Sequence, residues 1–124
     1  GDAAWSPPSD ATRVDVYVVY LAMTANGNGR FQVGAEVPLG TNTFVFPLDV
    51  LRASCTELLV YTRSILVEQT TPTVLTASDT DSSITGLNFT DKDLDAGELG
   101  GTISWVAPAD SSLVVDYVAY LSNS

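Results

Sequence analysis

Apolar and polar residues alternate with a period of two along most of the chain, and β-branched residues are frequent. This pattern is typical of β-strands, and no long stretch carries the apolar stripe of an amphipathic helix. Residues 14–21 (VDVYVVYL) are apolar on both faces of the alternation, which predicts a central strand covered on both sides. The sequence Asn26-Gly27-Asn28-Gly29 then predicts a hairpin turn, because Asn and Gly tolerate positive φ.

The rest of the chain predicts further short strands separated by turn signals. We expect them at residues 30–37, 43–46, 57–62, 65–69, 83–89, 102–106 and 114–121. Gly40 predicts a turn, and residues 47–53 fit either a single helical turn or an irregular crossover. Many short strands with closely spaced turns favour an all-β fold, an antiparallel β-sandwich.

The last twenty-four residues repeat the first twenty-four at an offset of 100. Identical residues fill nine equivalent positions, namely Gly1, Trp5, Pro8, Asp10, Val14, Tyr17, Val18, Tyr20 and Leu21 with Gly101, Trp105, Pro108, Asp110, Val114, Tyr117, Val118, Tyr120 and Leu121. The chain is therefore expected to hold about 1.25 units of a tandem repeat. Because it opens inside a repeat, we expect a segment of a longer precursor, so the lack of a visible signal peptide says little.

The break Thr70-Thr71-Pro72-Thr73 resembles a linker, which predicts one unit over residues 1–73 and the start of the next over residues 74–124. The composition supports folded units, since 45% of the residues are apolar and 16% are charged.

Three groups of residues resemble strands B and C of fibronectin type III domains, namely Ile103-Ser104-Trp105, Ala107-Pro108, and Tyr117 with Tyr120. The resemblance implies an immunoglobulin-like β-sandwich in which the Trp fills space between the sheets and Pro8 or Pro108 fixes the B–C loop. It further implies that residues 83–89 are strand A, residues 43–46 strand E and residues 57–62 strand F.

The chain departs from the family at Leu58, where these domains usually carry a tyrosine, so the exact strand order stays open. The unit is also similar to repeats in long secreted or surface-displayed proteins of unicellular eukaryotes, which implies an extracellular or cell-surface location.

The first and last twenty-four residues both resemble strands B and C, whereas only residues 83–89 resemble strand A. A single sandwich needs one strand A, one strand B and one strand C. The C-terminal A–B–C segment could fold back in place of the N-terminal copy. It could instead join a neighbouring molecule by β-strand addition, which would give head-to-tail fibres. The third possibility is that both copies belong to separate units of one continuous polypeptide.

Five basic residues face fifteen acidic ones, which gives a net charge of −10. Such a surface repels nucleic acids and anionic membranes and favours cations. Cys55 is the single cysteine, so it is either a small buried apolar residue or half of an intermolecular bridge. The chain has no histidine, the usual base and zinc ligand, and we expect no enzyme.

Carboxylates alternate in the loop that begins at Asp91, and a glycine follows them. Hard oxygen ligands at such spacing suit calcium, although the EF-hand register is not met because Thr102 stands at the twelfth position. The predicted ligands are Asp91, Asp93, Asp95 and Glu98, with Asp79 and Asp81 as weaker candidates upstream. The alternative is a solvated acidic loop without an ion.

Asn88-Phe89-Thr90 matches the acceptor pattern for N-linked glycosylation, with Asn88 as the modified residue. Thr70, Thr71 and Thr73 flank a proline and are candidates for O-linked sugars. Alternatively, these threonines serve only strand formation and solubility.

Two functions follow from these observations. The first is a structural repeat unit of an extracellular stalk, fibre or filament, whose units connect in tandem or by strand addition and are rigidified by calcium. The alternative is an adhesive module that binds glycans or a receptor through its loops.

Overall fold

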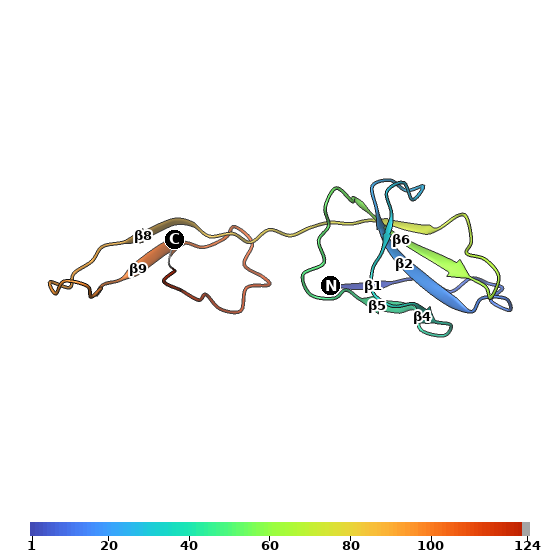
Figure 1. Ribbon diagram of the computed structural model, residues 1–124, viewed down its shortest axis with the longest axis horizontal. Helices are drawn as coiled ribbons and strands as arrows, with labels where there is room; N and C mark the ends of the chain where they lie inside the picture. Colours follow the sequence, from blue (N-terminus) through green and yellow to red (C-terminus); the bar gives the residue numbers. More distant parts are fainter. Residues whose placement is uncertain (123–124) are drawn as a thin grey trace. The chain divides into compact units, whose positions relative to one another are not determined.

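The computed structural model describes residues 1–122, which form an all-β structure and contain no helix. These residues divide into two compact units, the first ending at Ser78 and the second beginning at Asp79 (Figure 1). The first unit contains β1 (Asp2–Ala4), β2 (Val16–Ala22), β3 (Phe31–Gln32), β4 (Val37–Pro38), β5 (Thr43–Val45), β6 (Glu57–Arg63) and β7 (Thr73–Thr76). The second contains β8 (Thr85–Phe89) and β9 (Ile103–Val106).

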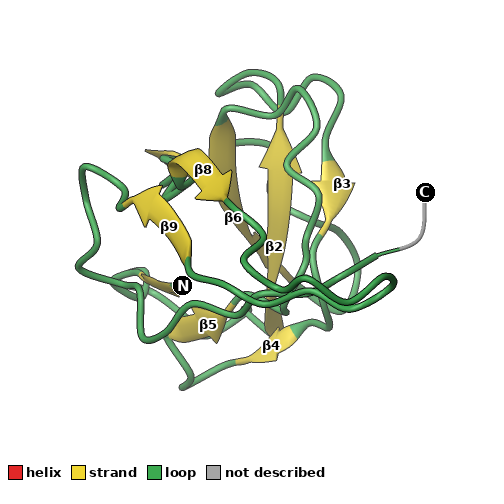
Figure 2. Cartoon of the chain, turned by 90° about the vertical axis from the view of Figure 1, so that its left-hand side faces the viewer, coloured by secondary structure: helices red, strands yellow, loops and turns green. Residues whose placement is uncertain are grey.

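The strands of the first unit form two antiparallel sheets. The larger has the order β3-β2-β6-β7, and β4 also pairs with β2. Figure 2 shows β2 between β3 and β6. The smaller consists of β1 and β5, with Ala3 opposite Phe44. The long pairing of β2 with β6, in which Val19 faces Val60, lies at the centre of the larger sheet.

The main core of the first unit lies between these two sheets. Alternate residues of β2, Tyr17, Val19 and Leu21, point into it from the larger sheet, and Ala3 points into it from β1. Phe44 of β5 packs against the same cluster. Two sheets that enclose one apolar layer are consistent with the expected β-sandwich.

The other face of the larger sheet is also covered, as the two-sided apolar pattern of residues 14–21 predicts. Leu59 and Tyr61 of β6 are fully buried there, and the Tyr61 ring meets Tyr20 edge-on at 5.5 Å. The Arg30 guanidinium lies 4.7 Å and 4.4 Å from the centroids of these two rings, a cation–π contact. Glu68 accepts hydrogen bonds of 2.8 Å from both Arg30 and the Tyr20 hydroxyl.

The predicted hairpin turn is confirmed, since Gly27 and Gly29 have φ values of 80° and 62° between β2 and β3. The single returning strand expected over residues 30–37 is wrong. It is replaced by the short strands β3 and β4, which pair separately with β2, because positive φ at Gly34 interrupts the extended backbone. Residues 47–53 form the irregular crossover rather than the helical turn.

The structure places the boundary between units later than the Thr-Pro break. Thr73 opens β7, which pairs with β6 and therefore belongs to the first unit. Residues 65–69, expected as a strand, contribute only an isolated bridge between Arg63 and Glu68. The threonine-rich segment is thus part of a connection within the first unit.

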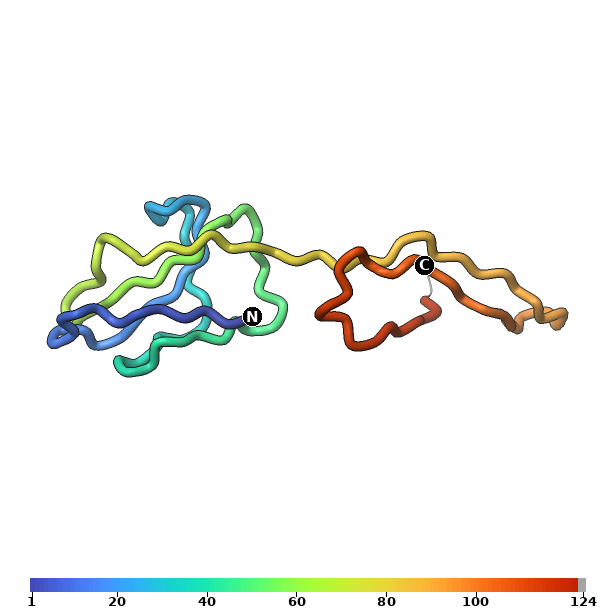
Figure 3. The backbone as a smooth tube through the Cα atoms, turned by 180° about the vertical axis from the view of Figure 1, so that it is seen from behind, coloured from blue at the N-terminus to red at the C-terminus, as the bar shows by residue number. Residues whose placement is uncertain are grey.

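In the second unit, β8 and β9 form an antiparallel pair with an irregularity between Thr85 and Asn88. Residues 107–121 follow as an open loop (Figure 3). The strand predicted over residues 114–121 is therefore wrong, although its equivalent in the first unit is β2. The physical reason is that β2 is held by β3, β4 and β6, and the described part of the second unit has no such partners.

Candidate functional site

A contact between a Trp ring and a Tyr ring, which we call the Trp–Tyr corner, occurs once in each copy of the repeat. Trp5 meets Tyr17 with ring centroids 5.3 Å apart, and Trp105 meets Tyr117 at the same separation. Interplanar angles of 65° and 57° show similar tilts. In the first copy Tyr17 is buried and Trp5 packs against the main core, as predicted. In the second copy Tyr117 is 42% exposed, so the Trp–Tyr contact forms there without a surrounding core.

The loop after each Trp also repeats. The Asp10 carboxylate accepts a hydrogen bond from the Thr12 N–H at 3.0 Å, and Asp110 accepts one from the Ser112 N–H at 2.9 Å. These backbone hydrogen bonds lower the pKa of both carboxyl groups. The repeat seen in the sequence is thus a repeat of local structure over these corners.

The two copies differ in what covers them. In the second unit an open apolar groove of about 560 Å³ lies beside the β8–β9 pair. Leu87 and Phe89 of β8 line it with 68% and 40% of their surfaces exposed. Ile103, Trp105 and the loop residue Tyr117 complete the aromatic and aliphatic lining. An open apolar surface of this kind is a candidate interaction site.

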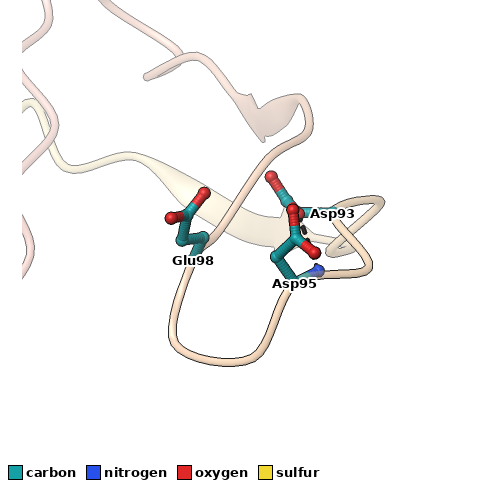
Figure 4. A group of neighbouring side chains, drawn as sticks. All are labelled: Asp93, Asp95 and Glu98. Atoms are coloured by element: carbon teal, nitrogen blue, oxygen red, sulfur yellow. Dashed lines mark hydrogen bonds between the residues drawn. The ribbon is translucent and has the colours of Figure 1, made fainter.

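The acidic loop follows β8. The carboxylates of Asp93, Asp95 and Glu98 bring one oxygen each within 4.8 Å of one another (Figure 4). Asp93 also accepts a hydrogen bond of 2.9 Å from the Asp95 N–H, which closes the turn between them. Calcium prefers six to eight oxygen ligands, and the three oxygens brought together here are fewer than that, so calcium binding stays a prediction.

Asp91, the first predicted ligand, is not part of this trio. Its Oδ1 accepts hydrogen bonds of 3.0 Å from the N–H groups of Gly100 and Asp93. These bonds, that from Gly100 first, lower the pKa of Asp91, and they join the two ends of the loop. Asp91 therefore organises the loop on which the other three carboxylates lie.

The remaining predicted residues lie elsewhere. Among the described residues, Asp79 and Asp81 are not grouped with the trio, and Asp81 accepts a hydrogen bond of 2.6 Å from the Ser83 hydroxyl. Asn88 lies in β8, opposite Ser104, and is exposed. The candidates for O-linked sugars are exposed as well: Thr70, Thr71 and Thr73.

Cys55 is 2% exposed and belongs to the main core, which fits the expectation of a buried apolar residue. Sequence reasoning missed the apolar groove, although a signal was present. Leu87 and Phe89 alternate with polar residues in β8, as Ile103 and Trp105 do in β9. This alternation predicts one face of a complete sandwich, whereas the structure leaves that face open.

Comparisons of the chain with protein-family models, with curated proteins and with solved structures find no significant match. Within residues 1–122 there is also no long apolar helix of the kind that spans a bilayer. The functional argument therefore depends on the chain's own repeat and surfaces.

Proposed function

We propose that this chain is a structural repeat unit of an extracellular or cell-surface stalk, fibre or filament. The observation that carries the proposal is the recurrence of one local structure at both ends of the chain. The Trp–Tyr corner appears twice, 100 residues apart. So does the loop in which Asp10 or Asp110 accepts a hydrogen bond from the backbone N–H two residues later. Repeated units that contact their neighbours are typical of extended structural proteins.

We further propose that the unit is of the fibronectin type III kind. In immunoglobulin-like sandwiches, strands B and E share one sheet, and strands C, F and G share the other. If β1 and β2 are strands B and C, the pairing of β1 with β5 and of β2 with β6 follows this arrangement. The β7 strand then takes the place of strand G beside β6.

The open groove of the second unit supports an assembly role. Its lining is apolar and aromatic, and it lies on the copy of the corner that lacks the sheets of the first unit. Water-exposed apolar surface is unfavourable by about 25 cal/mol per Å², so covering it by another unit stabilises an array.

Electron microscopy and light scattering over a range of protein concentrations test the proposal. We expect mass to rise with concentration and particles to join end to end in regular, unbranched rows. A chain that stays monomeric at high concentration and binds on a glycan array would contradict the structural role and favour the adhesive alternative.

A further inference from the structure

Three side chains on the outer face of the larger sheet, the face turned away from β1 and β5, surround a guanidinium group. Tyr20 of β2 and Tyr61 of β6 provide two rings that meet edge-on, with centroids 5.5 Å apart and planes at 86°. Glu68 follows β6 and provides a carboxylate. We call these three residues the cation site. The group inside it is the guanidinium of the chain's own Arg30.

The contacts of Arg30 are those by which proteins recognise organic cations. Its guanidinium carbon lies 4.7 Å from the centroid of the Tyr20 ring and 4.4 Å from that of Tyr61, within the range of a cation–π interaction. The Arg30 Nη2 donates a hydrogen bond of 2.8 Å to Glu68. A planar, weakly hydrated guanidinium suits two rings and a carboxylate, because it stacks and donates hydrogen bonds at the same time.

The walls of the cation site are held by contacts that do not involve Arg30. Tyr61 is 1% exposed and packs beside Leu59 on the outer face of the sheet. The Tyr20 hydroxyl donates a hydrogen bond of 2.8 Å to Glu68. The backbone of Glu68 is tied to the end of β6 by a bridge to Arg63. We therefore expect the two rings and the carboxylate to keep their places when the Arg30 side chain leaves.

Arg30 is held less firmly than the walls around it. Its side chain is 36% exposed, so water and dissolved cations reach the site. Ion pairs with this much exposure contribute little, because solvent screens them and long side chains lose entropy when they are fixed. Arg30 lies in the turn before β3, and rotation about its side-chain bonds takes the guanidinium into water without moving a strand. Another guanidinium can therefore take its place.

We propose that the cation site binds an arginine side chain of a partner protein, and that Arg30 is an internal occupant that this arginine displaces. The net charge of −10 favours a basic partner. A guanidinium is the expected group rather than an ammonium, because only its planar fork stacks on the rings while it donates to the carboxylate. The residues involved all belong to the first unit, and the proposal does not rest on the structural role.

Binding of a single arginine group to the full chain tests the proposal. The probe is N-acetyl-arginine methylamide, and the control ligand is N-acetyl-citrulline methylamide, which has nearly the same shape but no charge. NMR shifts of the Tyr20 and Tyr61 ring protons give the dissociation constant. Arg30→Gln opens the site. Arg63→Gln is the matched control, because Arg63 is 35% exposed and pairs with Glu36 instead of with the two rings.

We expect the Arg30→Gln chain to bind the arginine probe about tenfold or more tightly than the parent chain, because an internal occupant reduces the fraction of molecules that are competent to bind. Arg63→Gln should bind the probe as the parent does. The citrulline probe should leave both rings unshifted. Equal affinities of the two variants, or equal binding of the two probes, would overturn the inference.

A second pair of substitutions tests the carboxylate. In the Arg30→Gln background, Glu68→Gln should weaken binding of the arginine probe about tenfold, because a charge-assisted hydrogen bond is lost. Glu36→Gln removes the same charge outside the cation site and should leave the affinity unchanged. Equal effects of these two substitutions would show that general charge, and not the cation site, attracts the probe.

Folding of the variants is followed by circular dichroism. If Arg30→Gln does not unfold cooperatively, Arg30→Lys takes its place, since lysine keeps the positive charge beside the rings. Lysine lacks the planar fork and should be displaced more easily than Arg30, so this variant should also bind the arginine probe more tightly than the parent chain does. An affinity no higher than that of the parent would then contradict the proposal.

Discussion

Equivalent leucines in the two copies lie in opposite environments, which allows a matched test of which copy completes the first unit. Leu21, in β2, is 4% exposed and packs in the main core, whereas Leu121 is 87% exposed. If the N-terminal copy forms the sandwich, Leu21→Ala should destabilise the core and Leu121→Ala should not. Both substitutions remove the same atoms at the same place in the repeat.

The expected loss can be worked out from the burial of Leu21. Its three lost carbons contribute about 2.4 kcal/mol at ~0.8 kcal/mol per carbon, and the remaining cavity raises the cost to about 3 kcal/mol. A unit of this size has a free energy of unfolding of roughly 4–12 kcal/mol, so the loss is a large fraction. The melting temperature should fall by roughly 10–25 °C, because each kcal/mol shifts a small domain by several degrees.

Thermal and urea unfolding, followed by far-UV circular dichroism, measure both variants against the parent chain. We expect Leu121→Ala to unfold with the parent's midpoint. If Leu121→Ala loses as much stability as Leu21→Ala, or more, the C-terminal copy has replaced the N-terminal one in the sandwich. That result would refute the assignment of the core to the N-terminal copy.

Three further measurements test individual groups. The hydrogen bond from the Gly100 N–H lowers the pKa of Asp91 below its ordinary value of 3.8, so the stabilisation is present above that pH and is lost as the pH falls through the folded value. NMR titration of the carboxyl should show this low pKa, and an ordinary value would contradict the loop geometry. Native Cys55 should resist a thiol reagent and react only in urea; fast native labelling would show that it is not in the core. If the acidic loop binds calcium, the melting temperature should be lower in EDTA than in calcium. Asp95→Asn should abolish this difference in melting temperature, whereas the control Asp81→Asn should keep it. Identical melting curves of the parent chain in calcium and in EDTA would contradict calcium binding.

The strands with strong local signals were predicted well from the sequence. Val16–Ala22 and Glu57–Arg63 are apolar on both faces, and both became central strands of the larger sheet. The Asn-Gly turn needed positive φ at Gly27, and local chemistry was sufficient to place it. The β7 strand was missed because its residues Thr73–Thr76 are exposed and follow a proline, so only the edge of β6 holds them in a sheet.

The candidate site was predicted less well. Alternating carboxylates correctly marked an acidic loop, but spacing did not reveal that Asp91 would accept hydrogen bonds from Gly100 across the loop. Likewise, alternation in β8 identified an apolar face without showing that it would be open. Long-range contacts decide both features, and such contacts leave no fixed spacing in the sequence.

The sequence alone determined that the chain is β-rich, acidic and repetitive, because these properties follow from composition, alternation and identity at a fixed offset. The identity at a fixed offset also predicted that the two ends would share local features, and the Trp–Tyr contact does recur in both copies. Only the tertiary structure decided what the following segment became. Residues 16–22 are a buried strand, whereas their equivalents near the C-terminus are an exposed loop, because a strand is stable only where other strands satisfy its backbone and cover its side chains.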